Sequence, residues 1–412
     1  MKKSFSALLA LTTIGAFFVT SCSKDDSASA GNEMGSSTSQ NGEITDSTGL
    51  SSSSEEAIPC DTEGAFVWSE QGVSYSLCKD GFWQGHIVEP YVSNGFDECQ
   101  FNFGAAWQSA HEKEDFYRGL DYIAVWLGDN DFYNYFEMRM VRMCLKINAT
   151  PMIYAYVIAE FGKDQGLVDC DMVNAEHPNS LCTDGAELIR NHFADSVLFR
   201  YKEYAEGMRD QLETEDVDPS TFQSIWMIEP DFYQYSESAS KQKNAFDSTG
   251  QVNGGIPDSL MGSYFKQIVA TIRTYLPAAK IAIDISPWIS DRDSSAQRRW
   301  YSNFDMDEID YLSTSGGRTL AGSDKIRTAN KAKWRELYEL TGKPILADAG
   351  YDQGGQGTGH ALIWDKTANI LDRMADGVIG VMQMDAKYGY PALADTVRPQ
   401  LNYQYPWCTE KK

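Results

Sequence analysis

Two carboxylic acids stand at the end of an apolar segment near the middle of this 412-residue chain. The segment reads 225-IWMIEPDFYQY-235, so Glu229 and Asp231 follow a strand-like run and precede a group of aromatic residues. Hydrolysis of a glycosidic bond needs two carboxyl groups, one protonated as an acid and one ionised as a base or nucleophile. The residue types and their spacing therefore indicate acid–base chemistry on a sugar.

Acids recur at the ends of other apolar segments, and aromatic residues stand close to them. A single acid at such a place is commonly a helix N-cap or a turn residue, so the set carries the inference. Sugar rings stack on aromatic faces, and carboxylates bind their hydroxyls. The predicted catalytic residues are Asp231, Asp284, Glu229, Asp385 and Asp348. The predicted substrate-binding residues are Tyr154, Tyr156, Glu160, Tyr233, Trp288 and Gln383.

The elements that must position these residues alternate along the chain from about residue 99. Near-continuous apolar strands that alternate with helices indicate a parallel sheet, and eight of them fit a β/α barrel whose site lies at the carboxyl ends of its strands. A doubly wound sheet is the alternative, and a seven-stranded or distorted barrel stays open. The predicted strands are 101–107, 122–128, 151–161, 224–231, 280–288, 309–316, 343–350 and 378–386; clear helical patterns cover 187–212, 259–276 and 325–342.

The segment that ends at Asp231 resembles a known family of glycosidases. An apolar strand that ends in Ile-Glu-Pro-Asp after a long helix is similar to glycoside hydrolase family 6, the inverting cellobiohydrolases and endoglucanases. In that family the aspartate of this motif is the general acid, so the resemblance implies that role for Asp231. It also implies an inverting mechanism, with a β-linked polysaccharide, a β-1,4-glucan by preference, as the substrate.

The order of elements extends the resemblance over residues 150–390. A strand that ends in Asp284, with Trp288 shortly after it, is similar to the family, and Asp385 matches a later acid on the last strand. The segment 154–170 departs from the family's pattern. The acid that would tune the general acid is therefore open between Glu160, Asp164 and Asp169.

A retaining barrel glycosidase is the alternative reading. In such enzymes the acid/base ends the fourth strand and the nucleophile ends the seventh, which are the places of Glu229 and Asp348 in the strand count. The segment 343-KPILADAG-350 is similar to the seventh strand of cellulases and mannanases. Those families have Asn where Ile228 stands here, and they use Glu as the nucleophile.

The two acids of the opening segment do not by themselves choose between these mechanisms. Glu229 and Asp231 lie on the same side of an extended chain, with Pro230 turning it. A separation of about 5 Å between the catalytic carboxyl groups implies retention, and one of roughly 6.5–9.5 Å implies inversion. A third interpretation is a non-catalytic carbohydrate-binding lipoprotein, in which the carboxylates are too far apart or point away from the cleft.

The N-terminal 57 residues are predicted to lie outside the folded part of the chain. Residues 1–22 carry two lysines, an apolar run and the ending 19-VTSC-22, so they resemble a lipoprotein signal peptide that is cleaved before Cys22. Residues 23–57 are Ser-rich with few large apolar groups, which is typical of a flexible tether. We therefore expect an exported protein that is lipid-anchored through Cys22 at the bacterial cell envelope, on the outer membrane or cell surface.

The remaining chain divides into a small β module at 58–95 and the barrel at 99–408. A formal net charge of −24 makes nucleic acid a poor partner, because an acidic protein repels phosphate. The spacings typical of zinc sites are missing, so we expect no metal and no cofactor. The expected partner is a polysaccharide or oligosaccharide, and we expect a monomer.

Cysteine usage fits an exported chain, in which disulfides are permitted. With Cys22 lipidated, seven of the eight cysteines remain. Cys144 lies in an apolar run, where we expect a buried free thiol. The predicted pairs are Cys60 with Cys78, Cys170 with Cys182 and Cys99 with Cys408, although spacing does not fix connectivity.

Overall fold

The computed structural model describes most of the chain beyond residue 57. The described residues are 58–61, 66–68, 74–87, 96–108, 113–128, 133–170, 172, 176, 178–237, 254–286, 289, 295–315, 319–327, 332–350, 364–386 and 389–409. The predicted signal peptide, Cys22 and the tether lie outside these residues, and so does Trp288.

The N-terminal module is a three-stranded antiparallel sheet of β1 (Phe66–Trp68), β2 (Ser74–Lys79) and β3 (Phe82–Ile87). Asp80 and Gly81 join β2 to β3 with φ values of 54° and 78°. Two positive φ angles are what a tight hairpin turn of the Asp-Gly type requires. The disulfide between Cys60 and Cys78 ties the preceding segment to β2. The predicted β character of this module is confirmed.

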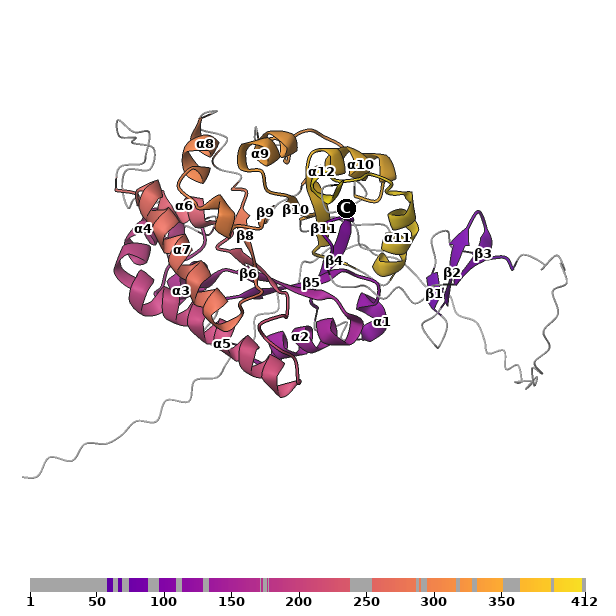
Figure 1. The fold of residues 1–412 in the computed structure, drawn as a ribbon, viewed down its shortest axis with the longest axis horizontal. Coiled ribbons are helices and arrows are strands. Elements are labelled where there is room, and N and C mark those ends of the chain that lie inside the picture. The colour runs from indigo at the N-terminus through magenta and orange to yellow at the C-terminus, as the bar shows by residue number, and fades with distance from the viewer. Residues whose placement is uncertain are drawn as a thin grey trace, which may run out of the picture. The chain divides into compact units, whose positions relative to one another are not determined.

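Eight parallel strands close into a barrel (Figure 1). Each strand pairs with the next, and the last pairs with the first, which closes the ring. The predicted barrel is confirmed, and the doubly wound and seven-stranded alternatives are wrong. In chain order the strands are β4 (Asn102–Ala106), β5 (Tyr122–Leu127), β6 (Thr150–Ala155), β7 (Ile225–Ile228), β8 (Lys280–Asp284), β9 (Tyr311–Ser313), β10 (Ile345–Asp348) and β11 (Val378–Gln383).

Helices surround the strands, as Figure 1 shows. None of the helices in the described part of the chain is long and apolar enough to span a membrane. The helices are α1 (Glu114–Tyr117), α2 (Tyr135–Ile147), α3 (Val157–Asp164), α4 (Leu181–His192), α5 (Leu198–Thr214), α6 (Phe232–Ser236), α7 (Asp258–Tyr275), α8 (Ala296–Tyr301), α9 (Trp334–Thr341), α10 (Thr367–Ala375), α11 (Tyr390–Val397) and α12 (Pro406–Thr409).

Two predicted helices differ from the structure in extent. The stretch 187–212 is interrupted by a π-helical turn at Phe193–Val197 between α4 and α5. The pattern at 325–342 becomes helical only at Trp334. Before that point the backbone of Ile326 hydrogen-bonds to Leu320 and Ala332, which holds the chain in a loop that also carries Arg327.

The predicted strand 151–161 ends earlier than its apolar run. Strand β6 stops at Ala155, and α3 begins at Val157. The Ile158 amide in the first turn of α3 donates to Glu229 Oε1 at 2.9 Å. A helix N-terminus has free amides that an acidic group can accept from, and here that group comes from 71 positions further along the chain. A cap from so distant a residue cannot be predicted from the residues around 155–157.

The amino-terminal end of the barrel is closed by the residues just before β4. The Phe96 ring lies 5.8 Å from the Tyr122 ring and 5.5 Å from the Tyr311 ring. These tyrosines start β5 and β9, which are not neighbours in the barrel, so both rings point into its interior. The disulfide between Cys99 and Cys408 joins this end to α12.

All three predicted disulfide pairs are formed, and Cys144 is a buried free thiol as expected.

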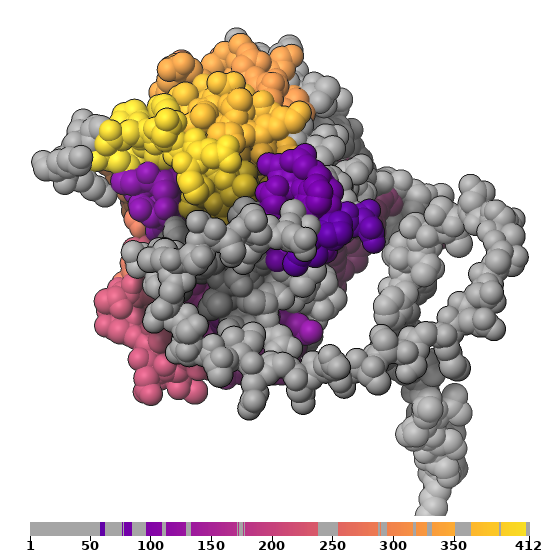
Figure 2. Space-filling view, turned by 90° about the vertical axis from the view of Figure 1, so that its right-hand side faces the viewer, coloured from indigo at the N-terminus to yellow at the C-terminus, as the bar shows by residue number. Residues whose placement is uncertain are grey.

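At the carboxyl-terminal part of the chain, Arg373 of α10 donates to the carbonyl oxygens of Ala321 and Ser323. Figure 2 shows this C-terminal segment, in yellow, against the orange segment that precedes it.

Candidate active site

The inner face of the barrel can be followed by strand register from the two interior tyrosines. Ser313 is two residues after Tyr311 and pairs with Asp284 on one side and Leu346 on the other. Alternation then places Asp284 and Asp348 on the inner face at the carboxyl ends of β8 and β10. These two predicted site residues therefore lie at the end of the barrel where β/α-barrel sites form.

Glu229 follows directly after β7, the fourth strand of the barrel, and has a φ of +45°. Its Oε1 accepts hydrogen bonds from the Ile158 amide at 2.9 Å and from the Tyr201 hydroxyl at 2.8 Å. Its Oε2 is buried and has no hydrogen-bond partner among the described residues. Burial raises the pKa of Glu229 to about 8, although these two hydrogen bonds lower it and the charge of Asp231 raises it further.

Asp231 stands just before α6 and is half-buried. The Tyr235 hydroxyl donates to its Oδ2 at 3.4 Å. Burial raises the pKa of Asp231 to about 6; the Tyr235 hydrogen bond opposes that rise, and the negative charge of Asp169 adds to it. Asp231 and Glu229 are therefore both shifted toward the protonated form, as a general acid requires.

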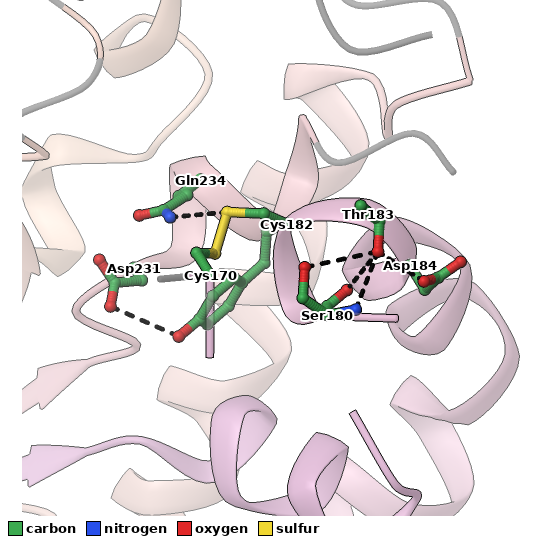
Figure 3. Close-up of a disulfide and its surroundings, with 8 residues drawn as sticks. Cys170, Ser180, Cys182, Thr183, Asp184, Asp231 and Gln234 are labelled. Carbon is green, nitrogen blue, oxygen red and sulfur yellow. Dashed lines mark hydrogen bonds between the residues drawn. A yellow bond between two sulfur atoms is a disulfide. The ribbon is translucent and has the colours of Figure 1, made fainter. Parts of the chain in front are cut away.

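A disulfide lies beside Asp231 at the rim of the site (Figure 3). Cys170 and Cys182 are bonded, and the Gln234 side chain in α6 donates to Cys182 Sγ at 2.8 Å. In Figure 3, Asp231 and Gln234 lie on the same side of this disulfide. The bridge thus holds Asp169, one of the predicted tuning acids, near the element that follows Asp231.

Asp284 is 3% exposed and accepts a hydrogen bond of 3.3 Å from the Ser315 hydroxyl at Oδ1. Its Oδ2 is buried without a hydrogen-bond partner among the described residues. Burial raises the pKa of Asp284 well above its ordinary range; the charge of Asp231 adds to the rise, and that of Arg327 opposes it. The Asp284 carboxyl is therefore shifted toward its neutral form.

Asp348 ends β10, the seventh strand, and is 1% exposed. The Gly350 amide donates to Asp348 Oδ1 at 2.7 Å. Its own amide donates to the Thr314 hydroxyl at 2.7 Å, which fixes the end of β10 against the segment after β9. An amide donor to a carboxylate oxygen favours its charged form.

Arg327 is a site residue that the sequence did not reveal. It is 7% exposed, and its charge interacts with those of Asp284, Asp348 and Asp231. Its position in the chain falls within a predicted helix, 14 residues after the end of the sixth strand, so the local sequence gave no signal for it. The tertiary structure brings it to the carboxyl groups.

Aromatic residues line part of the same end. Tyr154 lies on the inner face of β6 and stacks on Trp126 of β5, with ring centroids 4.8 Å apart at 13°. Tyr156 stands just before α3 and is half-buried. Its hydroxyl group interacts electrostatically with Tyr235 and Arg327, which places it beside the carboxyl cluster. Trp126 was not predicted, although the alternation in 122-YIAVWLG-128 could have indicated it.

Four predicted residues lie away from the cluster. Tyr233 is buried against Trp300, with ring centroids 5.0 Å apart. Gln383 is buried at the end of β11. The preceding residue, Met382, pairs with the inward-facing Asp348, and successive side chains of a strand point to opposite faces, so Gln383 faces outward. Asp385 is exposed in the turn after β11. Glu160 forms an ion pair of 2.7 Å with Lys163 within α3.

No group of three or more His, Cys, Asp or Glu residues is placed to hold a metal ion within the described ranges. The side chains of the site have a chemistry of their own. Three carboxyl groups, those of Glu229, Asp231 and Asp284, are shifted toward the protonated form and can donate a proton. The Asp348 carboxyl accepts from an amide, which favours its charged form, and a carboxylate can stabilise positive charge on a bound ring.

The fold and the site define a closed eight-stranded β/α barrel with a buried carboxyl cluster at the carboxyl ends of its strands. The chain matches no protein-family model and no curated protein sequence. Among solved structures it is similar to a ruminal family 26 endo-β-1,4-mannanase, with 11% identity and a TM-score of 0.41, covering 74% of this chain and 63% of that one.

Two further solved structures are similar at the same level. An endo-1,4-β-mannanase from Eisenia fetida has 13% identity and a TM-score of 0.40, and the match covers 80% of this chain and 96% of that one. An endo-1,4-β-xylanase from Caldicellulosiruptor owensensis has 12% identity and a TM-score of 0.39, with 71% and 87% covered. Similarities this low give no ground for assigning an activity, and the resemblance to family 6 stays a prediction.

Proposed function

We propose that this protein is a retaining glycoside hydrolase that cleaves a β-linked polysaccharide, with Glu229 as acid/base and Asp348 as nucleophile. The observation that carries the proposal is the position of these residues in a closed barrel of eight strands. Glu229 directly follows the fourth strand, and Asp348 ends the seventh. The strand count therefore supports the retaining alternative over the inverting one.

The environment of Glu229 supports its part in this mechanism. Its pKa of about 8 keeps it protonated near neutral pH. Oε1 already accepts two hydrogen bonds, so Oε2 is the oxygen that can carry the proton. That proton passes to the glycosidic oxygen while an Asp348 oxygen attacks the anomeric carbon, and the leaving alcohol departs. The Glu229 carboxylate then takes a proton from water, which attacks the same carbon and releases Asp348.

An inverting mechanism with Asp231 as general acid is the competing candidate. Asp231 is less buried than Glu229, and its pKa of about 6 also favours protonation. In this mechanism an ionised carboxyl, that of Asp348, activates the water. Both candidates use the same end of the barrel, and they differ in the configuration of the first product.

Proton NMR of the freshly released sugar tests the mechanism. The full chain is incubated with β-glucan, mannan and xylan, and reducing ends are assayed in parallel. We expect the β-anomer to appear first, and we expect azide to restore turnover to Asp348→Asn as a glycosyl azide. Immediate formation of the α-anomer, with Asp231→Asn inactive and Glu229→Gln active, would establish the inverting mechanism instead.

The same panel tests whether the protein is an enzyme. Affinity electrophoresis with each polysaccharide is run beside the reducing-sugar assay. Retarded migration without any release of reducing ends would contradict the hydrolase proposal and favour a carbohydrate-binding protein.

We further propose that the protein is exported and lipid-anchored at Cys22. The signal-peptide pattern at 1–22 and the Ser-rich stretch at 23–57 support this. Metabolic labelling with a palmitate analogue in a bacterial host tests it. Label in the wild-type chain that is lost in Cys22→Ser is the expected result, and an unlabelled wild-type chain would contradict the anchor.

A further inference from the structure

The Arg327 side chain is fixed at the carboxyl ends of two neighbouring strands. Its Nη2 donates to the Ser315 carbonyl oxygen at 2.5 Å, just beyond β9, and its Nη1 donates to the Ile285 carbonyl oxygen at 3.5 Å, just beyond β8. The residue is 7% exposed. A guanidinium stays charged even when it is buried, so a permanent positive charge lies at this end of the barrel.

Two aspartates flank this charge. Strand β9 lies between β8 and β10, so Asp284 stands on one side of the Arg327 anchor and Asp348 on the other. The main titratable groups whose charges act on Arg327 are, in decreasing order of strength, Asp284, Asp348, Asp231 and Tyr156. Tyr122, on the inner face of β5, also interacts with Asp348.

The two aspartates have unequal surroundings. Asp348 accepts a 2.7 Å bond from the Gly350 amide, which favours its charged form. Asp284 accepts a longer bond of 3.3 Å from the Ser315 hydroxyl, and the negative charge of Asp231 acts on it as well. Burial favours the neutral form of both carboxyls, and at Asp284 the like charge of Asp231 adds to that effect. Arg327 interacts more strongly with Asp284 than with Asp348, but at Asp284 burial and the charge of Asp231 outweigh it, which leaves Asp348 as the anionic partner.

We propose that Arg327 is a positioning residue that keeps Asp348 ionised while Asp284 beside it remains protonated. The naming of Asp348 as nucleophile rests on the proposed function, whereas the charge states do not. A retaining enzyme needs its nucleophile ionised before the substrate arrives. Arg327 supplies the charge for this from the loop after the sixth strand.

Isotope-edited infrared spectroscopy tests the charge states without using activity. The full chain carries aspartate labelled with ¹³C in the side-chain carboxyl, and spectra are taken from pH 4 to pH 8. At pH 7 we expect Asp284→Asn to remove a protonated-carboxyl band and Asp348→Asn to remove a carboxylate band. The opposite pattern, or loss of a carboxylate band in both variants, overturns the proposal.

Substitution of Arg327 tests the cause of these charge states. In Arg327→Gln an additional protonated carboxyl band should persist above pH 5, and it should be missing from the double variant with Asp348→Asn. Arg327→Lys keeps the charge and should restore the wild-type titration. Identical aspartate titrations in wild type and Arg327→Gln overturn the proposal.

A buried arginine elsewhere in the fold provides the matched control. Arg373 is also 7% exposed and also binds loop carbonyl oxygens, but its ion pair is with Asp376 at 2.7 Å. Arg373→Gln should lower the melting temperature without changing the carboxyl titration near pH 7. If both variants change only the melting temperature, Arg327 has a structural role alone and the proposal is overturned.

The activity profile separates this inference from the proposed function. The acid limb of kcat/KM in Arg327→Gln should move up by about one pH unit or more, because an opposite charge nearby changes the pKa of a carboxyl by that amount. Activity at a pH below the limb should then fall about tenfold for each pH unit by which the limb moves. A wild-type chain that hydrolyses nothing refutes the proposed function, and the infrared result still decides the role of Arg327.

Discussion

The Tyr201 hydroxyl donates a hydrogen bond of 2.8 Å to Glu229 Oε1, although the two residues are 28 positions apart. Tyr201 belongs to α5, outside the barrel, and Glu229 to the turn after β7. The Ile158 amide of α3 binds the same oxygen. A single buried oxygen thus joins three elements around the end of the fourth strand, and it leaves Oε2 for a ligand.

Replacing Tyr201 with phenylalanine should raise the pKa of Glu229 further. The hydroxyl stabilises the ionised carboxylate, so its loss favours the protonated acid. Because the general acid must be protonated, the alkaline limb of the pH–activity profile should move to higher pH. We also expect a loss of about 1 kcal/mol in the free energy of unfolding, measured in urea.

Tyr405→Phe is the control for this substitution. Tyr405 is also buried and donates to the Val378 carbonyl oxygen at 2.7 Å, at the start of β11. The Tyr405→Phe variant should lose similar stability and keep the alkaline limb of the wild-type pH–activity profile. An unchanged limb in Tyr201→Phe would show that Glu229 is not the acid.

The raised pKa of Glu229 also predicts how stability depends on pH. Between its ordinary value of 4.5 and about 8, the native protein retains a proton that the unfolded chain has released. The free energy of unfolding that this group contributes therefore falls as pH rises through that window, by at most about 1.4 kcal/mol per pH unit. Glu229→Gln cannot ionise, so it should gain stability relative to wild type from pH 5 to pH 8.

Urea unfolding of both proteins across this window measures the effect. Glu213→Gln, on the exposed part of α5, is the control for the loss of a surface carboxylate. A difference between Glu229→Gln and wild type that stays constant with pH would mean that Glu229 is ionised in the native state.

Substitution of Asp169 distinguishes the two candidate acids. The negative charge of Asp169 raises the pKa of Asp231, so Asp169→Asn should lower it. With Glu229 as the acid, we expect the alkaline limb to stay where it is in wild type. A limb that moves to lower pH identifies Asp231 as the acid. Asp210→Asn, on the exposed part of α5, is the matched control for the loss of a surface charge.

Gly104→Ala tests the packing of the barrel interior. An ideal Cβ on Gly104 would come within 2.3 Å of the Tyr122 ring, which is itself fully buried. Overpacking of this kind costs about 1–3 kcal/mol, so the midpoint of urea unfolding should fall. Gly322→Ala should cost less, because the nearest atom to its new Cβ is the Asn369 side-chain nitrogen at 3.3 Å. Equal stability of the two variants would contradict the predicted crowding.

The sequence by itself determined the barrel and the strand ends that carry the acids. Each strand is a short apolar run, because a parallel strand is buried on both faces and needs apolar residues at nearly every position. The order of these runs alone was therefore enough to place Glu229, Asp284 and Asp348 at the ends of the fourth, fifth and seventh strands. The three disulfide pairs were also predicted from the sequence, as a choice among several connectivities.

Only the tertiary structure decided which of these residues meet. Gln383 and Tyr233 stand near strand ends but face away, because the side of a strand or helix that a residue occupies depends on register and packing. Arg327 reaches the aspartates through a loop whose local pattern resembles a helix. Charges act through space, so a cation that comes from the loop after the sixth strand can set the ionisation of an acid on the seventh without any signal in the sequence between them.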